Sequence, residues 1–414
     1  MNMKTEPGSA AEQAGPRTRM LVIATLGFAV TFWAWALISP LAPSLATKLG
    51  LSSFQQSLIV AVPVIVGSLG RIPIGALTDR FGGRLMLPIV SVATIVPVLF
   101  LAFFGDQSLA TLLIGGFFLG IGGTSFAVGV PFVSAWFPPE RRGLAIGIFG
   151  VGMVGTAISA FTTVRLVDLG SSATPFMVTA AALAVYAVVA WLLLRDAPGQ
   201  VRPTTSMAKR VGETLKLGVT WQAAALYATL FGGYVAFSVY LPSLLKAEYD
   251  LSIADASNRM AGFVILAVIM RPVGGFLSDK IGPVPVLATC LGAVVFGALI
   301  DATSPALFPI ATIAYLVMAA GLGAGSGATF ALVALLSPAG KVGSVTGVVG
   351  AAGGLGGFVP PLLMGVVYGA TGSYTIGFLL LALVAAAVLV FTLTSIRSVL
   401  AKRDAVEVQR KVTA

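Results

Sequence analysis

The chain has 414 residues, of which 57% are hydrophobic and only 10% are charged, and its formal net charge is +10. Soluble domains carry about 25% charged residues, so this composition excludes an ordinary water-soluble protein and a disordered one. The single cysteine, Cys290, excludes an intrachain disulfide, and the lack of histidine removes the commonest metal ligand. We therefore expect neither a metal nor any other cofactor.

Twelve segments are long and apolar enough to cross a bilayer, since one span needs about 20 mostly apolar residues. They lie near 20–46, 56–78, 85–105, 108–136, 143–166, 173–194, 220–245, 257–278, 283–301, 306–336, 343–368 and 374–396. The sequence thus predicts an all-α polytopic membrane protein with six spans in 19–195 and six in 219–396. Polar residues are expected to form a disordered tail over 1–18, a linker over 196–218 and a second tail over 397–414.

The Lys and Arg residues are divided unequally between the two sides of these spans. Of the 25 in the chain, four fall on the side away from the N-terminus, two lie inside spans, and the rest fall on the side of the N-terminus. The four are Lys48, Arg165, Lys246 and Arg259. Cytoplasmic loops collect positive charge, so we expect both termini in the cytoplasm and the chain in the plasma membrane. The membrane topology therefore accounts for the positive net charge, and we expect the lipid bilayer and not a nucleic acid as the partner. Nothing in the sequence requires more than a monomer.

The two halves of the chain repeat at an offset of 200 residues. The stretch 71–80, RIPIGALTDR, returns as 271–280, RPVGGFLSDK, with arginine, glycine, leucine, aspartate and a basic residue in matching places. Phe126 in the fourth span is likewise echoed by Phe330 in the tenth. Two related six-helix halves predict a pseudo-twofold fold with a substrate site at their interface, near the bilayer midplane.

Arg71 and Arg271 are the two basic residues inside spans. Arg71 lies eight residues before Asp79, which marks the end of its span. That spacing places it ~12 Å deep, near the middle of a ~30 Å hydrocarbon core, and the same holds for Arg271. All 15 acidic residues fall in loops, tails or span ends, so the neutralising anion is expected to be the substrate. Two guanidinium forks suit a small planar oxyanion. The alternative is that one arginine binds backbone carbonyls freed by Pro63, Pro73 or Pro272.

Glycines recur every three or four residues in the fifth and eleventh spans. They include Gly147, Gly150, Gly152, Gly155, Gly350, Gly353, Gly354 and Gly357. Such bare strips let helices approach closely. We predict that they also act as sliding faces for alternating access.

The turn 75–84, GALTDRFGGR, resembles the loop between the second and third helices in the major facilitator superfamily, and 275–282 is its second copy. The resemblance covers essentially the whole chain and implies the major facilitator fold. We predict a cytoplasmic latch at this turn, in which an aspartate at a helix end pairs with basic groups in one conformation only. Its residues are Asp79, Arg80, Arg84, Asp279 and Lys280.

Two further stretches are similar to signatures of the nitrate/nitrite porters, one branch of that superfamily. They are GIGGTSFAVGV at 120–130 and GVVGAAGGLGGF at 347–358. The resemblance implies that the paired arginines of the second and eighth spans clamp nitrate or nitrite. It also implies that aromatic rings of the fourth and seventh spans stack on the anion, and these rings are Phe126, Tyr227 and Phe231.

One departure from that family concerns selectivity. Met153 stands where the family usually carries an asparagine, and methionine cannot donate a hydrogen bond. Thr124 and Ser125 also replace residues that are often glycine or asparagine, and their hydroxyls are candidates to compensate.

The resemblance implies a secondary transporter rather than an enzyme, and the residues favour nitrate/nitrite antiport. No acidic residue lies at depth to carry a proton, and two fixed positive charges make the empty site costly to close. Proton-coupled nitrate symport stays open, because the family contains both types. A porter for another small anion, such as cyanate, formate or a short carboxylate, also stays open because of Met153.

Overall fold

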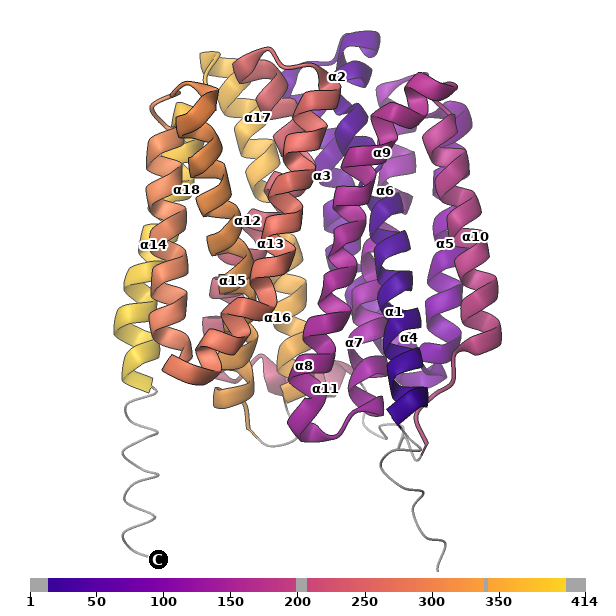
Figure 1. Ribbon diagram of the computed structural model, residues 1–414, viewed down its shortest axis with the longest axis vertical. Coiled ribbons are helices and arrows are strands. Elements are labelled where there is room, and N and C mark those ends of the chain that lie inside the picture. The colour runs from indigo at the N-terminus through magenta and orange to yellow at the C-terminus, as the bar shows by residue number, and fades with distance from the viewer. Residues whose placement is uncertain (1–13, 199–206, 339–341, 400–414) are drawn as a thin grey trace, which may run out of the picture.

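The computed structural model describes residues 14–198, 207–338 and 342–399. Within these residues no strand is present, and twelve helical segments are long and apolar enough to cross a membrane. Each coincides with a predicted span, so the prediction of an all-α twelve-span fold is confirmed. Figure 1 shows the segments standing side by side, with the N-terminal half on the right and the C-terminal half on the left.

Six spans make up the N-terminal half, and four of them consist of more than one helical piece. The pieces are α1 (Ala14–Trp35), α2 (Ile38–Leu49), α3 (Ser53–Leu69), α4 (Arg71–Phe81), α5 (Gly83–Phe104), α6 (Leu109–Leu119), η1 (Gly120–Thr124), α7 (Ser125–Trp136), α8 (Pro139–Gly150), η2 (Val151–Val154), α9 (Gly155–Leu169) and α10 (Thr174–Leu193).

The C-terminal half follows a short connecting helix, α11 (Met207–Thr214), and its first three spans each form one long helix. The elements are α12 (Gly218–Tyr249), α13 (Ile253–Ile281), α14 (Pro283–Asp301), η3 (Leu307–Ala311), α15 (Thr312–Leu336), α16 (Val342–Gly356), α17 (Val359–Thr371), α18 (Thr375–Phe391) and η4 (Thr392–Ile396).

The expected tails and linker are only partly covered by the structure. Helix α1 begins at Ala14, so the last residues of the expected N-terminal tail are helical rather than disordered. The linker likewise contains α11. Residues 1–13, 199–206 and 400–414 of these segments lie outside the described residues.

Serine and glycine residues lie at the helix starts where the chain turns from one span to the next. Ser52 and Ser108 each accept a hydrogen bond from the backbone of the third residue of the next helix, which satisfies one of its free N–H groups. Gly82 and Gly282 each adopt a positive φ, of +86° and +87°, between the second and third spans of their half. Glycine reaches this conformation without a Cβ clash, so the repeated turn explains both positions.

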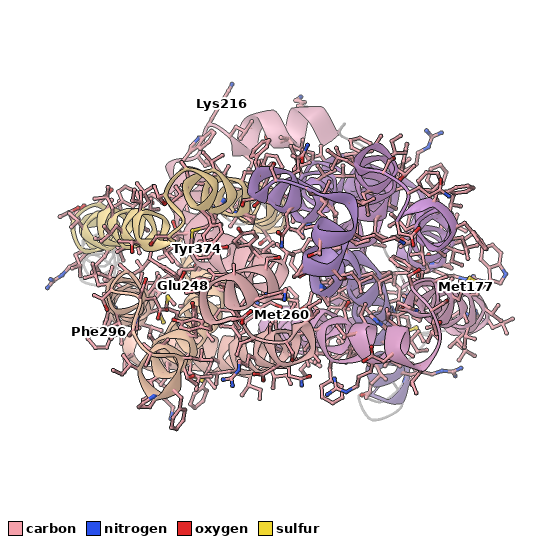
Figure 2. All side chains as sticks on the ribbon, turned by 90° about the horizontal axis from the view of Figure 1, so that it is seen from above. Met177, Lys216, Glu248, Met260, Phe296 and Tyr374 are labelled. Atoms are coloured by element: carbon pink, nitrogen blue, oxygen red, sulfur yellow. The ribbon has the colours of Figure 1, made fainter. Side chains whose placement is uncertain are left out.

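The two halves lie next to each other across an elongated cross-section. Figure 2 places Met177 of α10 and Phe296 of α14 at opposite ends of it. On the side away from the chain ends, the Ser39 hydroxyl donates to the Val239 carbonyl and Arg165 donates to Asn258 Oδ1. Both hydrogen bonds join one half to the other, so the halves meet closely on this side.

Candidate functional site

Arg71 occupies the first position of α4, where the second span is interrupted at Gly70. Its side chain is buried, with 8% of its surface exposed. Nε donates to the Gly123 carbonyl of η1 at 3.3 Å, and Nη1 donates to the Gly350 carbonyl of α16 at 2.8 Å. The first acceptor belongs to the same half and the second to the other half, so Arg71 bridges the interface.

Arg271 lies inside the continuous helix α13 and is 7% exposed. Nη1 donates to Met153 Sδ of η2 at 2.7 Å, and Nη2 donates to the Tyr227 hydroxyl of α12 at 2.8 Å. Arg271 therefore also bridges the interface, in the opposite direction. The repeat relates the two arginines but not their acceptors across the interface. A Cβ on Gly150, which matches Gly350, would lie 3.8 Å from the Arg271 Cζ, whereas the group that accepts from Arg271 is Met153.

Aromatic rings surround both guanidinium groups. The Arg71 Cζ lies 5.2 Å from the Phe126 ring centre, and the Arg271 Cζ lies 5.8 Å from that of Phe330. The Phe231 ring centre lies near both guanidinium groups, 6.0 Å from the Arg71 Cζ and 5.5 Å from the Arg271 Cζ. The two cations therefore face one common ring.

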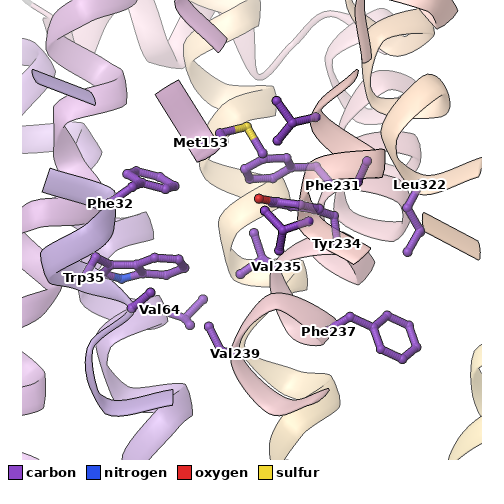
Figure 3. Packing of buried hydrophobic residues seen from close by; sticks show 14 of the residues in the cluster. Phe32, Trp35, Val64, Met153, Phe231, Tyr234, Val235, Phe237, Val239 and Leu322 are labelled. Carbon is purple, nitrogen blue, oxygen red and sulfur yellow. The ribbon is translucent and has the colours of Figure 1, made fainter. Parts of the chain in front are cut away.

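Tyr227 adds a second ring to this shell, with its centre 5.9 Å from the Arg271 Cζ. It stacks on Phe231 with centroids 4.6 Å apart and planes within 2° of parallel. Figure 3 shows Phe231 on the C-terminal half with Met153 reaching toward it from the N-terminal half. The predicted residues Phe126, Tyr227 and Phe231 are thus brought together with the arginines.

Neither arginine forms a salt bridge with any described carboxylate. A midplane arginine costs at least ~2.5–3.5 kcal/mol on insertion scales, and guanidinium cannot shed its proton to avoid this cost. Each arginine uses two of its five N–H donors in the bonds above, and the others stay available. The arrangement therefore carries two positive charges that an anion can neutralise.

The alternative of carbonyl binding applies to Arg71, but with different carbonyls from those expected. Its acceptors belong to glycines of the fourth and eleventh spans. Backbone carbonyls are neutral dipoles, so these bonds orient the guanidinium without cancelling its charge.

The three residues linked to selectivity take different places. Met153 lies at the site as an acceptor to Arg271. Thr124 donates to the Ile121 carbonyl of its own turn at 2.7 Å, and the Ser125 hydroxyl is bonded to Thr31 at 2.7 Å. The described hydrogen bonds thus engage both hydroxyls away from the arginines.

The glycines of the two strips have two kinds of neighbour, either the other half of the molecule or a helix of their own half. The neighbour of each glycine is the group that a Cβ at that position would meet. Gly150, Gly350 and Gly354 face the other half, at Arg271, Phe126 and Ser68 respectively. Gly152, Gly155, Gly353 and Gly357 pack within their own half, on α1 or on α12, whereas a Cβ on Gly147 would meet open space.

The residues of the predicted latch lie at the ends of α4 and α13, on the side of the chain ends. Arg80 and Lys280 lie over the rings of Phe81 and Phe276, at 5.3 Å and 4.4 Å. Asp79 is half-buried and Asp279 is exposed. The Arg84 backbone N–H donates to Asp196 Oδ1 at 3.0 Å.

Sequence reasoning missed two residues of these sites. Phe330 was matched to Phe126 by the repeat, and that correspondence was the available signal for its place beside Arg271. Asp196 caps the start of α5 from the end of the sixth span, and a Cβ on Gly82 would lie 2.6 Å from its carboxylate. No spacing in the chain links Asp196 to this turn, since more than one hundred residues separate them.

Comparisons with known proteins show the family of this chain. A sequence model of the Major Facilitator Superfamily matches residues 24–258 and 223–412. The probable nitrate/nitrite transporter NarK2 of Mycobacterium tuberculosis is 48% identical over 381 residues, covering 91% of this chain and 96% of that protein. The nitrite extrusion protein of Bacillus subtilis is 36% identical over 367 residues, covering 89% and 91%.

Solved structures show the same fold at low sequence identity. A D-xylose–proton symporter superposes with a TM-score of 0.72 at 16% identity, covering 91% of this chain and 97% of that one. A bacterial homologue of the human lysosomal transporter Spinster, in an inward-facing and occupied conformation, gives 0.71 at 19% identity, covering 92% and 97%.

Proposed function

Because the chain belongs to the nitrate/nitrite porter family of the major facilitator superfamily, we propose that it exchanges nitrate for nitrite across the membrane by alternating access. In this proposal the anion is held between Arg71 and Arg271. Both termini face the cytoplasm, the membrane is the plasma membrane, and the monomer is the working unit.

The observation that carries the proposal is the pair of buried arginines without a described carboxylate. A planar oxyanion can accept parallel hydrogen bonds from a guanidinium fork. The rings of Phe126, Phe231 and Phe330 line the cations and exclude water, which strengthens the attraction to an anion. In this proposal nitrate or nitrite accepts from both forks, since both guanidinium groups lie within about 6 Å of the Phe231 ring centre.

Exchange follows from the fixed charge of the empty site. Moving two unneutralised guanidinium groups through the closed state is costly, because low dielectric penalises buried charge. A bound anion lowers this cost in both directions, so reorientation is fast only when the site is occupied. Hydrogen bonds from both arginines already cross the interface, and an anion that replaces them can release one half from the other.

The glycine strips and the latch supply the moving parts of this cycle. Gly150, Gly350 and Gly354 face the other half without side chains, so the fifth and eleventh spans can approach it closely. The aspartates at the ends of α4 and α13 are placed to pair with basic groups when the cytoplasmic side closes.

The test is anion exchange in proteoliposomes loaded with nitrite, with nitrate outside, for the wild type and for Arg71→Lys and Arg271→Lys. Lysine keeps the charge and removes the planar fork, so it separates simple attraction from bidentate recognition. We expect at least a hundredfold loss of exchange in each variant, on the order of 3 kcal/mol for a charge-assisted pair of bonds. Full exchange in either lysine variant would contradict the clamp.

The same vesicles distinguish antiport from symport. Vesicles without internal nitrite or nitrate should take up no nitrate when only a pH gradient is applied. Uptake under that condition would establish proton symport instead. Failure of the wild type to move nitrate at all would direct attention to cyanate, formate or a short carboxylate, because Met153 occupies one N–H of Arg271.

A further inference from the structure

A polar pocket lies at the seam between the two halves, on the side away from the chain ends. It has a volume of about 390 Å³ and is lined by α2 and α3 of one half and by α12, α17 and Tyr374 of the other. Figure 2 is viewed from this side and places Tyr374 there. Ser243, in the pocket wall, lies twelve residues beyond Phe231 in α12, or ~18 Å along the helix. The pocket is therefore separate from the arginine pair.

The pocket holds an unusual basic residue. Of the four basic residues on this side, three are engaged by neighbouring polar groups: Lys48 by Asp106 at 2.6 Å, Arg259 by Asp255 at 3.2 Å, and Arg165 by Asn258 at 2.9 Å. Lys246, which lines the pocket, has no ion pair or hydrogen bond with any residue that the structure describes. Its ammonium group can therefore bind a ligand anion.

Hydroxyl groups face the same space. Ser243 is 3% exposed, and its Oγ finds no partner among the described residues, although a buried hydroxyl without a bond costs about 1–3 kcal/mol. Tyr240 and Tyr374 also line the pocket, and their hydroxyls lie 3.3 Å apart. One of these two hydroxyls donates to the other, so the Ser243 O–H, one tyrosine O–H and the Lys246 ammonium are the donors of this half-enclosed space.

We propose that this pocket is a second site for a small monovalent oxyanion, occupied before or after the arginine pair. The proposal rests on the proposed function, because it takes the ligand to be the transported anion. Lys246 supplies the charge and Ser243 supplies a hydrogen bond that is otherwise unmade. Asp250 also lines the pocket and is exposed, which keeps the affinity low enough for rapid release.

The pocket lies outside the contact that closes the two halves against each other on this side. An anion can therefore bind in the pocket before it passes between the halves. The hydrogen bond from Ser39 to the Val239 carbonyl lies one helical turn of α12 closer to the arginines than Ser243. An anion held at Lys246 is therefore near the interface that must open, and a local excess of anions raises the rate of entry.

The experiment uses cysteine reporters, since the native Cys290 is buried. Thr47 is exposed at the pocket and Gln56 lines it from α3, so Thr47→Cys and Gln56→Cys place a thiol there without touching Lys246. The rate of labelling is measured in the purified full chain with an anionic and a neutral methanethiosulfonate reagent. Nitrate should slow labelling by the anionic reagent.

Adding Lys246→Gln to each reporter should lower the ratio of anionic to neutral labelling about fivefold and abolish the protection by nitrate. Adding Asp250→Asn, the matched control, should raise that ratio. No protection by nitrate in either reporter, or an unchanged ratio in Lys246→Gln, would overturn the proposal and leave exchange through the arginine pair intact. Protection without nitrate exchange in the wild type would support this site and contradict the proposed transport.

Discussion

The two halves hold matching arginines with different kinds of acceptor. Arg71 donates to the backbone carbonyls of Gly123 and Gly350, whereas Arg271 donates to the side chains of Met153 and Tyr227. The surrounding helices differ in the same way, because the second span is interrupted just before Arg71 and the eighth runs through Arg271 unbroken.

This difference shows at which arginine a substitution can directly change the hydrogen-bond acceptors. Carbonyl acceptors are present whatever side chain follows, so substitutions change the hold on Arg71 only by moving the backbone. Side-chain acceptors can be replaced one at a time, so single substitutions can change the hydrogen bonds of Arg271. Selectivity among small anions is therefore expected to reside mainly in the acceptors of Arg271.

Among substitutions that spare the two arginines, the largest effect is expected at Gly353, which matches Met153 in the repeat. A Cβ there would lie 2.2 Å from the ring of Tyr227, which is stacked on Phe231 and cannot move aside. Gly353→Ala should lower the free energy of unfolding by about 1–3 kcal/mol and reduce exchange more than tenfold. The control is Gly292→Ala, whose Cβ meets nothing within 4 Å. Equal melting temperatures for the two variants would contradict the close packing.

Tyr227→Phe should have the next largest effect. It keeps the ring against Phe231 and removes only the hydroxyl that accepts from Arg271 at 2.8 Å. A hydrogen bond to a charged group contributes about 1.5–3 kcal/mol, so we expect the KM for nitrate to rise roughly tenfold or more.

Met153→Leu keeps a similar volume but removes the thioether acceptor that the anion is proposed to displace from Arg271. Because sulfur accepts weakly, we expect the KM for nitrate to fall by no more than about twofold. A larger effect in Met153→Leu than in Tyr227→Phe would reverse the assignment of the two acceptors.

A smaller effect is expected at the cap of α5. Asp196 accepts from the Arg84 backbone N–H next to Gly82, and the described structure has no corresponding acid at Gly282. Asp196→Asn should lower the free energy of unfolding by about 1 kcal/mol, as loss of an N-terminal carboxylate does. The melting temperature in detergent measures this. Asp168→Asn removes the same charge at an exposed helix end and should leave the melting temperature nearly unchanged.

The smallest effect concerns the basic residues on the side away from the chain ends, where Lys48 is paired and Lys246 has no partner in the part of the chain that the structure describes. The Lys48 ammonium, 2.6 Å away, lowers the pKa of the Asp106 carboxyl below its usual value. The folded pKa is thus below the unfolded one, so the pair stabilises above the unfolded pKa and this contribution is lost as pH falls through the folded pKa. The melting temperature of Asp106→Asn should fall less on acidification than that of the wild type. Parallel curves would show that the exposed pair contributes nothing measurable.

Much of this molecule follows directly from one-dimensional patterns. The twelve spans follow from apolar length and the two halves from the offset of 200 residues. The prediction that Arg71 and Arg271 lie deep follows from their distance to Asp79 and Asp279. The aromatic shell was reached through a resemblance to a family rather than through spacing. The repeat matches Phe330 to Phe126, but a repeat alone does not show which of the matched rings lies beside an arginine.

By itself, the sequence determined that the chain crosses a membrane twelve times and that two arginines lie deep without an acid beside them, because hydrophobic length and charge order are local properties. Only the tertiary structure decided which groups those arginines contact, why a side chain at Gly353 would clash, and that Lys246 has no partner among the described residues. These depend on distances between residues far apart in the chain, and such distances arise only when the two halves pack against each other.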